Sequence, residues 1–517
     1  MPGYFMGIDV GTTASKAILC SADGSMLATA SSEYPMQTPQ IGWAEQDPHD
    51  WWAATCDSIR SIRDQVDFAP GELGGIGLTG QMHGLVMLDG RGEVLRPCIM
   101  WNDQRAAPQC EQLEQRIGIQ ELLDRTGNRL LPGFTAPKIA WVAQNEPGIL
   151  SRTGMILLPK DYVRYRLTGG YFSDVADASG TSLLDCRNRR WSAAMLEAIG
   201  VDESMLPHVT ESPEPSSAIS HEGAQATGLA EGTPVVAGAG DQAAQAVGCG
   251  IVQEGVVSVT IGTSGVVFAS SDQWKTPQGG VLHSYCHAVP GQWHLMGVML
   301  SAAGSLKWYK DTLAESTCMQ ESQTGRDAYD LLTEEAATVP PGADGVFFLP
   351  YLSGERTPWP DPDARGTFLG LARHHQRAHV TRSVLEGITF GLADCLELVR
   401  SAGIEARRIR ISGGGASSTF WRQLCADVFK CRVATVNTTE GAAFGAAILA
   451  SVGAGCHESV QGAVKAMIHE EEEHDPGPQA AMYETLLERY DQLYPALKDL
   501  FRTMARQQQD AEDTPQG

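Results

Sequence analysis

Basic residues are scarce in this 517-residue chain, in which 38 Lys and Arg stand against 62 Asp and Glu, giving a formal net charge of −24. Such an acidic protein repels phosphate-rich surfaces, which argues against nucleic acids and anionic membranes as partners. If the ligand is a phosphate compound, backbone N–H groups and a metal ion must hold it locally.

The chain also lacks the signs of a disulfide framework and of a membrane segment. Its 12 cysteines are scattered singly, which indicates a reducing compartment. No apolar run reaches the ~18 residues of a membrane span, and the start "MPGYFMGIDV" does not resemble a signal peptide. We therefore expect a cytoplasmic protein with no membrane partner.

One short segment resembles a metal site, namely "HSYCH" with His283, Cys286 and His287. Its alternation predicts a strand on which residues 283 and 287 share one face while residue 286 points the other way. Because no fourth ligand follows nearby, we do not expect a metal ion here.

The length exceeds what one hydrophobic core usually organises, so we expect two domains. Two segments, "MGIDVGTTASKAIL" (6–19) and "VSVTIGTSGVVFAS" (257–270), each read as a strand, a Gly-Thr turn and a second strand. This repeat, half a chain apart, predicts a duplicated α/β architecture with a cleft between the copies.

Three helices are predicted around these hairpins. One starts after Asp47 with Pro48 in its first turn, and one covers 379–399 with an apolar stripe. The third covers 480–501 and is expected to bend at Pro495. The acidic run 469–478 is expected to be a solvated connector, and the end of the chain, 507–517, to be frayed.

Each Gly-Thr turn can point its N–H groups at an anion. Gly11, Thr12 and Thr13 form the first turn, and Gly262, Thr263 and Ser264 form the second. Asp9 precedes the first turn and would suit Mg²⁺, which binds carboxylates. The alternatives are two plain hairpin turns and a turn-capping aspartate.

Gly413, Gly414 and Gly415 form a third glycine-rich turn, which follows the strand "RRIRIS" and leads into a predicted helix. Such a turn lets a nucleotide approach the backbone closely, and the start of the helix favours negative charge. Close packing of the strand against the helix explains the glycines equally well.

Polar residues are grouped within 77–105, an otherwise strand-like segment. They are Gln81, His83, Asn102, Asp103 and Arg105. A polyol needs fixed donors and acceptors of this kind, because each hydroxyl taken from water needs a partner. A structural histidine is the alternative for His83.

Asp241 stands alone among small and apolar residues in "VVAGAGDQAAQAVGCG" (235–250). A buried carboxylate is costly unless it is compensated or used in chemistry. The alternative is that Asp241 caps the helix that follows.

Two long motifs then point to a family. With "GFTAPKIAWVAQN" (133–145), "GTFLGLARHHQRAHVTRSVLE" (366–386) and a C-terminal segment at 475–500, the chain resembles the FGGY family of carbohydrate kinases over residues 5–505. "QMHG" and "WNDQR" are similar to the pentulose branch rather than to the glycerol branch.

The resemblance implies a fold of two actin-like (ribonuclease H-like) α/β domains with a central interdomain cleft. Residues 1–248 would form the domain with the sugar site and the catalytic base, 249–506 the nucleotide-binding domain, and 507–517 a polar tail. The small residues around Asp241 would then let sugar and ATP approach closely. A homodimer is one assembly compatible with this resemblance.

The resemblance also implies roles for individual residues. Asp241 would be the catalytic base, and Asp9 would hold Mg²⁺. The residues implied for the sugar are Gln81, Met82, His83, Asp103, Arg105 and Gln242. Those implied for ATP are Gly11, Thr12, Thr13, Lys16, Gly262, Thr263, Ser264, Gly304, Gly414, Gly415 and Ser418.

The expected reaction is the ATP-dependent phosphorylation of a ketopentose at its terminal hydroxyl, with D-xylulose as the first candidate. Many relatives of that kind have Asp-Asn where this chain has Asp241-Gln242, so ribulose, gluconate and glycerol stay open as substrates. The rival is an actin-like ATPase that transfers no phosphate to sugar. It explains the two Gly-Thr turns but neither the polar group at 81–105 nor the two long motifs.

Overall fold

The computed structural model describes residues 3–438 and 440–512, which form two compact units. The first unit comprises residues 3–253, 270–294 and 440–469, and the second comprises 254–269, 295–438 and 470–512. The expected single boundary at residue 248 falls near the end of the first segment. Two later segments nevertheless return to the first unit, which a single boundary does not describe.

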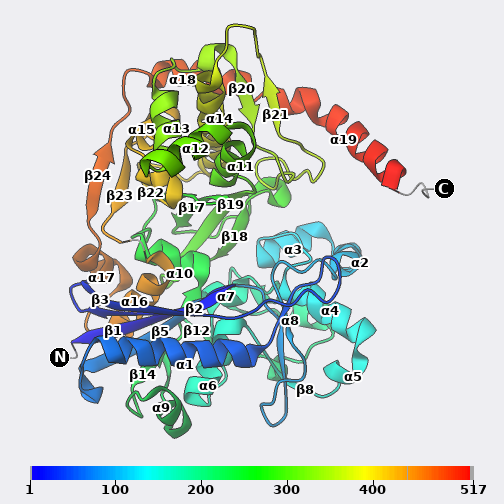
Figure 1. The fold of residues 1–517 in the computed structure, drawn as a ribbon. Coiled ribbons are helices and arrows are strands. Elements are labelled where there is room, and N and C mark those ends of the chain that lie inside the picture. The colour runs from blue at the N-terminus through cyan, green and yellow to red at the C-terminus, as the bar shows by residue number, and fades with distance from the viewer. Residues whose placement is uncertain (1–2, 439, 513–517) are drawn as a thin grey trace. The chain divides into compact units, whose positions relative to one another are not determined.

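The first unit is built on a twisted mixed sheet with strand order β13-β14-β5-β1-β2-β3, and β15 also pairs with β5 (Figure 1). Its strands are β1 (Tyr4–Val10), β2 (Ala14–Ser21), β3 (Met26–Glu33), β5 (Leu73–Gly80), β13 (Pro215–Ala218), β14 (Pro234–Val236) and β15 (Ala239–Gly240). The pairs β1–β2, β2–β3 and β13–β14 are antiparallel, whereas β1, β14 and β15 run parallel to β5.

The sheet of the second unit repeats this plan. Its strands follow the order β19-β17-β16-β22-β23-β24. They are β16 (Val256–Ile261), β17 (Gly265–Ser271), β19 (Trp293–Met299), β22 (Arg408–Ser412), β23 (Val433–Val436) and β24 (Glu470–His474). As in the first unit, an antiparallel hairpin (β16–β17) is followed by a parallel strand (β22), and the last strand is antiparallel. The predicted duplication is confirmed.

Helices surround both sheets. Those of the first unit are α1 (Pro48–Gln65), α2 (Ala107–Ile117), α3 (Ile119–Thr126), α4 (Thr135–Asn145), α5 (Pro147–Leu150), α6 (Pro159–Thr168), α7 (Val175–Ser179), α8 (Ala193–Ile199), α9 (His221–Thr227), α10 (Asp241–Gly248), α16 (Gly441–Gly453) and α17 (Val460–Met467). Those of the second unit are α11 (Ala303–Leu313), α12 (Glu315–Thr324), α13 (Ala328–Ala337), α14 (Arg377–Ser401), α15 (Thr419–Phe429), α18 (Ala480–Tyr490) and α19 (Leu493–Glu512).

The helix predicted after Asp47 is confirmed as α1. The Asp47 carboxylate accepts the N–H of His49 at 3.0 Å, and Pro48 occupies the first turn, where no N–H partner is needed. Trp51 and Ile59 of α1 are fully buried in one core with Ile8 of β1. Because side chains alternate along a strand, Gly7 and Asp9 point to the opposite face of β1.

That opposite face packs against α16, and glycine makes the contact possible. A Cβ on Gly7 would lie 1.9 Å from the carbonyl oxygen of Ala443, and one on Gly77 would lie 1.9 Å from that of Ala446. The same closeness joins α10 to α16, because a Cβ on Gly248 would lie 1.9 Å from the carbonyl oxygen of Gly441. The small residues after Asp241 therefore serve helix packing, whereas the sequence analysis assigns them to the approach of ligands.

The C-terminal region differs from the predictions in three ways. The predicted helix 379–399 is confirmed as α14, but the predicted bent helix 480–501 is two helices, α18 and α19. The ring of Pro495 would clash with the carbonyl of Asp491 in a continuous helix, so α18 ends there and Pro495 lies in the first turn of α19. Residues 507–512, predicted to be frayed, continue α19, and 513–517 lie outside the described residues.

The acidic run is also more ordered than predicted. Residues 470–474 form the edge strand β24, which pairs with β23. Glu470 forms ion pairs with Arg408 at 2.8 Å and Arg410 at 2.9 Å. These arginines lie on β22, far away in the sequence, so the charge pattern alone could not reveal them.

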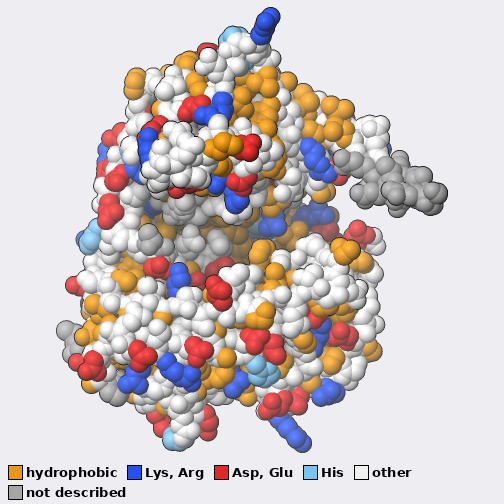
Figure 2. Space-filling view, viewed as in Figure 1, with side chains coloured by type: hydrophobic (Ala, Val, Ile, Leu, Met, Phe, Trp, Pro, Cys, Tyr) orange, Lys and Arg blue, Asp and Glu red, His pale blue; other side chains and the backbone are white. Residues whose placement is uncertain are grey.

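The surface shown in Figure 2 carries acidic and basic side chains interspersed with apolar ones. Among the described helices, none is long and apolar enough to cross a membrane.

Candidate active site

The carboxyl ends of three parallel strands bring the predicted residues of the first unit together. In the register of the sheet, Asp9 of β1 and Ala239 of β15 both lie beside Thr79 of β5. The chain continues from β5 into Gln81, Met82 and His83, and from β15 into Asp241 and Gln242. Such strand ends are the usual place for a ligand site in an α/β sheet.

Asp241 is the first residue of α10, and the helix cap is Gly240 rather than Asp241. One carboxylate oxygen, Oδ1, accepts the N–H of Gln242 at 2.7 Å, and the side chain of Gln242 also hydrogen-bonds to the carboxylate. Burial, followed by the negative charge of Asp9, raises the pKa of Asp241 to about 7, although the hydrogen bonds from Gln242 lower it. A carboxylate with a pKa near neutrality suits a general base.

Asp9 has a buried oxygen, Oδ1, that accepts no hydrogen bond from the described residues. Burial raises the pKa of Asp9 to about 6, the charge of Lys16 lowers it and that of Glu440 raises it. Lys16 faces Asp9 across the β1–β2 pair, and its ammonium binds Glu440 at 2.8 Å. An orphaned carboxylate oxygen fits a hard divalent cation, whose preferred ligands are oxygens.

The first Gly-Thr turn is fixed through its carbonyl groups. Tyr34 donates its hydroxyl to the carbonyl of Gly11 at 2.6 Å and its N–H to that of Thr13, and Gln46 donates to that of Thr12 at 2.7 Å. The N–H groups of Thr12 and Thr13 donate to no described residue. The turn therefore presents N–H groups that could donate hydrogen bonds to an anion.

Gln81, predicted to contact the sugar, is buried beside this turn. Its side chain donates to Gln46 at 3.2 Å and accepts from the Thr12 hydroxyl at 3.5 Å. The indole of Trp101, which is 43% exposed, also donates to the Thr12 hydroxyl, at 3.0 Å. These amide contacts connect Gln81 to the turn. Trp101, the first residue of "WNDQR", is not among the predicted site residues.

Met82 and His83 lie against glycines. His83 has a left-handed backbone (φ 71°), and its Nδ1 lies 2.7 Å from the carbonyl oxygen of Gly180. The imidazole stacks on Phe134 at 4.5 Å between ring centroids. Met82 is buried where a Cβ on Gly180 or Gly240 would collide with it. Tight packing thus fixes both side chains beside the start of α10.

The first long motif, 133–145, supports the loop that carries Met82 and His83. It forms α4, whose Thr135 hydroxyl and Lys138 ammonium donate to the carbonyl of His83 at 2.9 and 3.1 Å. Lys138 is fully buried, and burial lowers its pKa to about 7. The motif therefore positions His83 through its backbone.

Asp103 and Arg105, both predicted to bind the sugar, form a buried ion network. The Arg105 guanidinium binds Asp103 and Glu45, each at 2.7 Å, and lies 3.6 Å from the ring centroid of Trp43. Asp103 also accepts the N–H of Ala44 at 2.7 Å and is fully buried. These contacts fix the chain after β7 (Cys98–Ile99).

The second Gly-Thr turn follows the pattern of the first. The carbonyls of Gly262 and Thr263 accept N–H groups from residues 302–304, the last of which is Gly304. The N–H groups of Thr263 and Ser264 donate to no described residue. Gly304 is confined because a Cβ would lie 2.8 Å from the carbonyl oxygen of Thr263.

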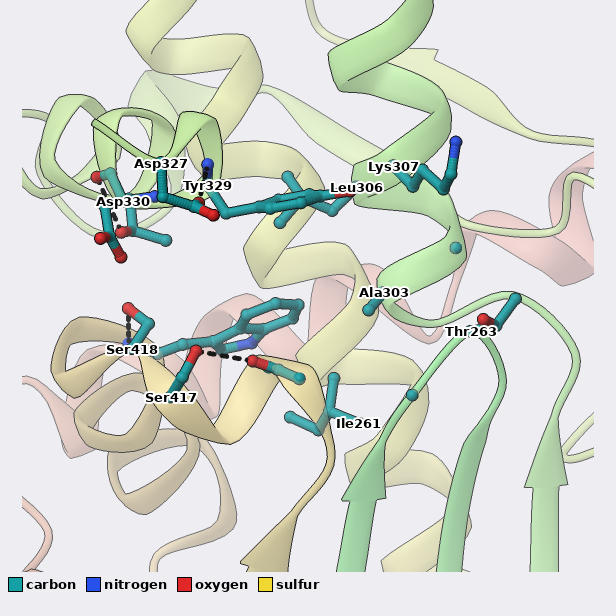
Figure 3. Close-up of a pocket in the computed structure, with 16 residues that line it drawn as sticks. Ile261, Thr263, Ala303, Leu306, Lys307, Asp327, Tyr329, Asp330, Ser417 and Ser418 are labelled. Atoms are coloured by element: carbon teal, nitrogen blue, oxygen red, sulfur yellow. Dashed lines mark hydrogen bonds between the residues drawn. The ribbon is translucent and has the colours of Figure 1, made fainter. Parts of the chain in front are cut away.

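A pocket of about 560 Å³ opens beside this turn in the second unit (Figure 3). Residues predicted for ATP that line it are Gly262, Thr263, Gly304, Gly414, Gly415 and Ser418. The volume is in the range of small-molecule sites, and the second Gly-Thr turn lines one part of the pocket.

The structure gives each of the three glycines at 413–415 a different environment. Gly413 needs its left-handed backbone (φ 84°), and a Cβ on Gly415 would lie 2.5 Å from Ile261. A Cβ on Gly414 would meet nothing within 4 Å. Packing therefore explains two of them, whereas Gly414 is open to the pocket. Ser418 caps α15 by accepting the N–H of Trp421 at 3.3 Å.

The sequence analysis missed the part of the wall that is formed by α13. Figure 3 shows Tyr329 and Asp330 of α13 facing the Ser417–Ser418 turn across the opening. Asp327 caps α13 by accepting the N–H of Tyr329 at 2.7 Å. The only signal for these residues is the helix cap itself, which does not point to a ligand.

Comparison with known proteins decides the family. Residues 4–248 match the N-terminal domain, and residues 257–454 the C-terminal domain, of the FGGY family of carbohydrate kinases. The chain belongs to this family. Similar proteins include the xylulose kinases of Escherichia coli (39% identical, covering 96% of this chain and 99% of that protein) and Bacillus subtilis (38%, 96% and 98%). A crystal structure of a xyloylose kinase from Brucella ovis is 38% identical, with a TM-score of 0.87, and the match covers 96% of this chain and 100% of that one.

As an FGGY kinase, the protein is an ATP:sugar phosphotransferase with two α/β domains. The second FGGY motif, 366–386, lies outside the lining of the 560 Å³ pocket. Its Arg382 and Glu386 form a buried ion pair at 2.8 Å, and both bind the hydroxyl of Tyr483 in α18. This motif therefore anchors the C-terminal helices.

The segment "HSYCH" supplies the strand β18 (His283–Cys286), as predicted. The described residues contain no group of three or more His, Cys, Asp or Glu side chains that could hold a metal ion.

Proposed function

We propose that this FGGY kinase transfers the γ-phosphate of ATP to the terminal hydroxyl, O5, of D-xylulose, giving D-xylulose 5-phosphate and ADP. The observation that carries the proposal is the Asp241 carboxylate, which has a pKa raised to about 7 and a place beside Asp9 at the strand ends. The relatives named as xylulose kinases support this choice of sugar.

In this reaction Asp241 accepts the proton of O5 as that oxygen attacks the γ-phosphorus. The N–H groups of the two Gly-Thr turns bind phosphate oxygens, as backbone nests do in other phosphate sites. The free N–H groups at residues 12, 13, 263 and 264 support this role. Phosphoryl transfer makes little covalent demand on a protein, so positioning and charge carry most of the catalysis.

Asp9 would hold Mg²⁺ through its orphaned Oδ1. When bound, the ion would neutralise charge on the phosphates. Lys16 and Glu440 would then set the local charge around Asp9 rather than contact the sugar.

The sugar would be held by Met82, His83 and Gln242. Gln81 would contribute through the Thr12 turn, to which its amide is hydrogen-bonded. Asp103 and Arg105, predicted as direct contacts, would act from a distance by fixing the chain around them.

The test measures ADP release by the full-length protein with ATP and Mg²⁺ in the presence of D-xylulose, D-ribulose, L-ribulose, D-gluconate or glycerol. D-Xylulose should give the highest kcat/KM, and ³¹P and ¹³C NMR of the product should place the phosphate on C5. A higher kcat/KM with another sugar would refute the substrate. ATP hydrolysis that ignores all sugars, together with sedimentable polymer, would favour the non-transferase ATPase.

A further inference from the structure

The second unit contains another cavity, of about 730 Å³, which the kinase reaction does not use. Its walls are the loop 337–341 after α13, one face of α15 and the segment 475–479 before α18. None of the residues that line it lines the nucleotide pocket.

Most of the cavity wall is apolar. It includes Val339, Pro340, Pro341, Phe420, Leu424 and Pro478. The one arginine on the wall, Arg382, is already satisfied, because it binds Glu386 at 2.8 Å and the carbonyl of Val339 at 2.5 Å. Its guanidinium lies 5.2 Å from the ring centroid of Phe420 and offers no charge to a ligand.

Asp427, by contrast, is a buried charge without a counter-ion. Its residue is 2% exposed, and among the described residues no cation lies within ion-pair distance of its carboxylate. Oδ1 accepts the N–H of Gly477 at 2.5 Å and the amide of Gln423 at 3.0 Å, whereas Oδ2 accepts no hydrogen bond from the described residues. The other carboxylate on the wall, Asp475, is paired with Arg432 at 2.7 Å.

A buried carboxylate is expensive without a cation, and a ligand that supplies one removes that cost. A metal ion is a poor candidate, because the described residues contain no cluster of three ligating side chains. An anion would be repelled by Asp427. The apolar wall favours a cation that also has an apolar body.

We propose that this cavity binds an organic ammonium compound, whose ammonium group pairs with Asp427 Oδ2 and whose apolar body packs on Phe420 and Leu424, and that its binding changes the affinity for ATP. The first part does not depend on the proposed sugar kinase reaction, because binding can be measured without turnover.

The link to ATP comes from two shared helices. The N-terminal half of α13, with Tyr329 and Asp330, lines the nucleotide pocket, whereas its last residue, Ala337, lines the second cavity. On α15, Trp421 faces the nucleotide pocket, and the preceding residue, Phe420, faces the second cavity. A ligand that moves either helix therefore changes both sites, and such coupling is reciprocal.

The binding test compares phenethylammonium with 2-phenylethanol, which has the same body but no charge, by calorimetry on the full-length protein at pH 7.5. Phenethylammonium should bind at least about tenfold more tightly than the alcohol. Asp427→Asn keeps an oxygen for Gly477 and Gln423 but removes the charge, so it should weaken phenethylammonium binding about tenfold or more.

The matched control is Asp475→Asn, which removes a charge that Arg432 already compensates and should leave binding unchanged. If Asp427→Asn does not fold, Ala337→Trp fills the exposed mouth of the cavity and should abolish binding instead. Equal binding of the alcohol, unchanged binding to Asp427→Asn or Ala337→Trp, or no measurable binding would overturn the site.

The coupling test measures the apparent KM for ATP with and without saturating phenethylammonium. A change of about two- to tenfold is expected in the wild type and none in Asp427→Asn, and ADP should shift phenethylammonium binding in calorimetry. An unchanged KM together with an unchanged affinity in the presence of ADP would overturn the coupling. Failure of the proposed sugar reaction would leave the calorimetry unaffected, so the two failures can be distinguished.

Discussion

The two Gly-Thr hairpins have similar turn sequences but different neighbours. The Gly11 N–H donates to the carbonyl of Ala14 at 3.0 Å, and the Gly262 N–H donates to that of Ser264 at 3.1 Å. In each, the two following residues have N–H groups that donate to no described residue. The equivalent strand positions, however, carry Asp9 in the first hairpin and Thr260 in the second.

This one difference separates their chemistry. Asp9 has an orphaned oxygen and lies beside the strand end that leads to Asp241, whereas Thr260 shares a hydrogen bond with Ser412 at 3.0 Å. We therefore expect both turns to bind anions, and the side chains around each turn to decide what the anion can do. The following variants test this comparison, from the largest expected effect to the smallest.

Asp241→Asn should reduce kcat by about 10²- to 10⁴-fold, the usual contribution of a general base, with a smaller effect on the KM for D-xylulose. Wild-type kcat/KM should fall below pH 7, because the base works only when deprotonated and burial raises its pKa to about 7. Steady-state kinetics between pH 5 and 9 check both. A variant with near-wild-type kcat would remove Asp241 from the mechanism.

Asp9→Asn should reduce activity about 10- to 100-fold and shift the Mg²⁺ titration to higher concentration, because a carboxylate ligand is lost. Thr260→Val, at the equivalent position of the other hairpin, should leave the Mg²⁺ titration in place. Initial rates at varied Mg²⁺ provide the measurement. If both variants shift the titration alike, the hairpins do not differ as described.

Gly11→Ala and Gly262→Ala should each raise the KM for ATP about tenfold while the free energy of unfolding changes by less than about 1 kcal/mol. The new Cβ at Gly262 would lie 3.5 Å from the nearest atom, an ordinary contact, and that at Gly11 would lie 3.2 Å from the carbonyl oxygen of Ala14, which must shift by a few tenths of an ångström. The fold therefore accommodates both changes at small cost, and the loss falls on the ligand. Gly77→Ala is the contrast. Its Cβ would lie 1.9 Å from the carbonyl oxygen of Ala446, and it should destabilise the fold by more than about 3 kcal/mol.

Asp241→Asn should also raise the Tm by about 2–4 °C at pH 8, because it removes a poorly solvated charge. The folded-state pKa of Asp241 is raised, so its carboxylate costs stability that is absent near pH 4, grows between pH 4 and 7 and is complete above pH 7. Calorimetry at pH 4 and pH 8 tests this. An equal Tm for both proteins at pH 8 would show that the charge is well solvated.

The elements with local signals were predicted well. Asp47 and Pro48 mark the start of α1, the apolar stripe marks α14, and the repeated Gly-Thr turns mark both hairpins. Each of these signals depends on residues close together in the chain. The sequence predicts one helix that bends at Pro495, whereas Pro495 lies in the first turn of a new helix, α19.

Features that depend on distant partners could not be predicted. Glu470 lies in an edge strand, where it pairs with Arg408 and Arg410 across β23. The small residues of α10 pack against α16. Tyr329 and Asp330 line the 560 Å³ pocket because α13 packs beside α15. Nothing within a short window of sequence encodes these pairings.

The sequence by itself determined the duplicated hairpins, the family and the candidate base, because turn residues and long motifs act through the backbone of neighbouring positions. Only the tertiary structure decided which charges are compensated. Arg105 forms ion pairs with Asp103 and Glu45. Asp9 and Asp427, by contrast, each have a carboxylate oxygen that accepts no hydrogen bond from the described residues. Whether a buried charge costs stability or serves a ligand depends on what surrounds it in three dimensions.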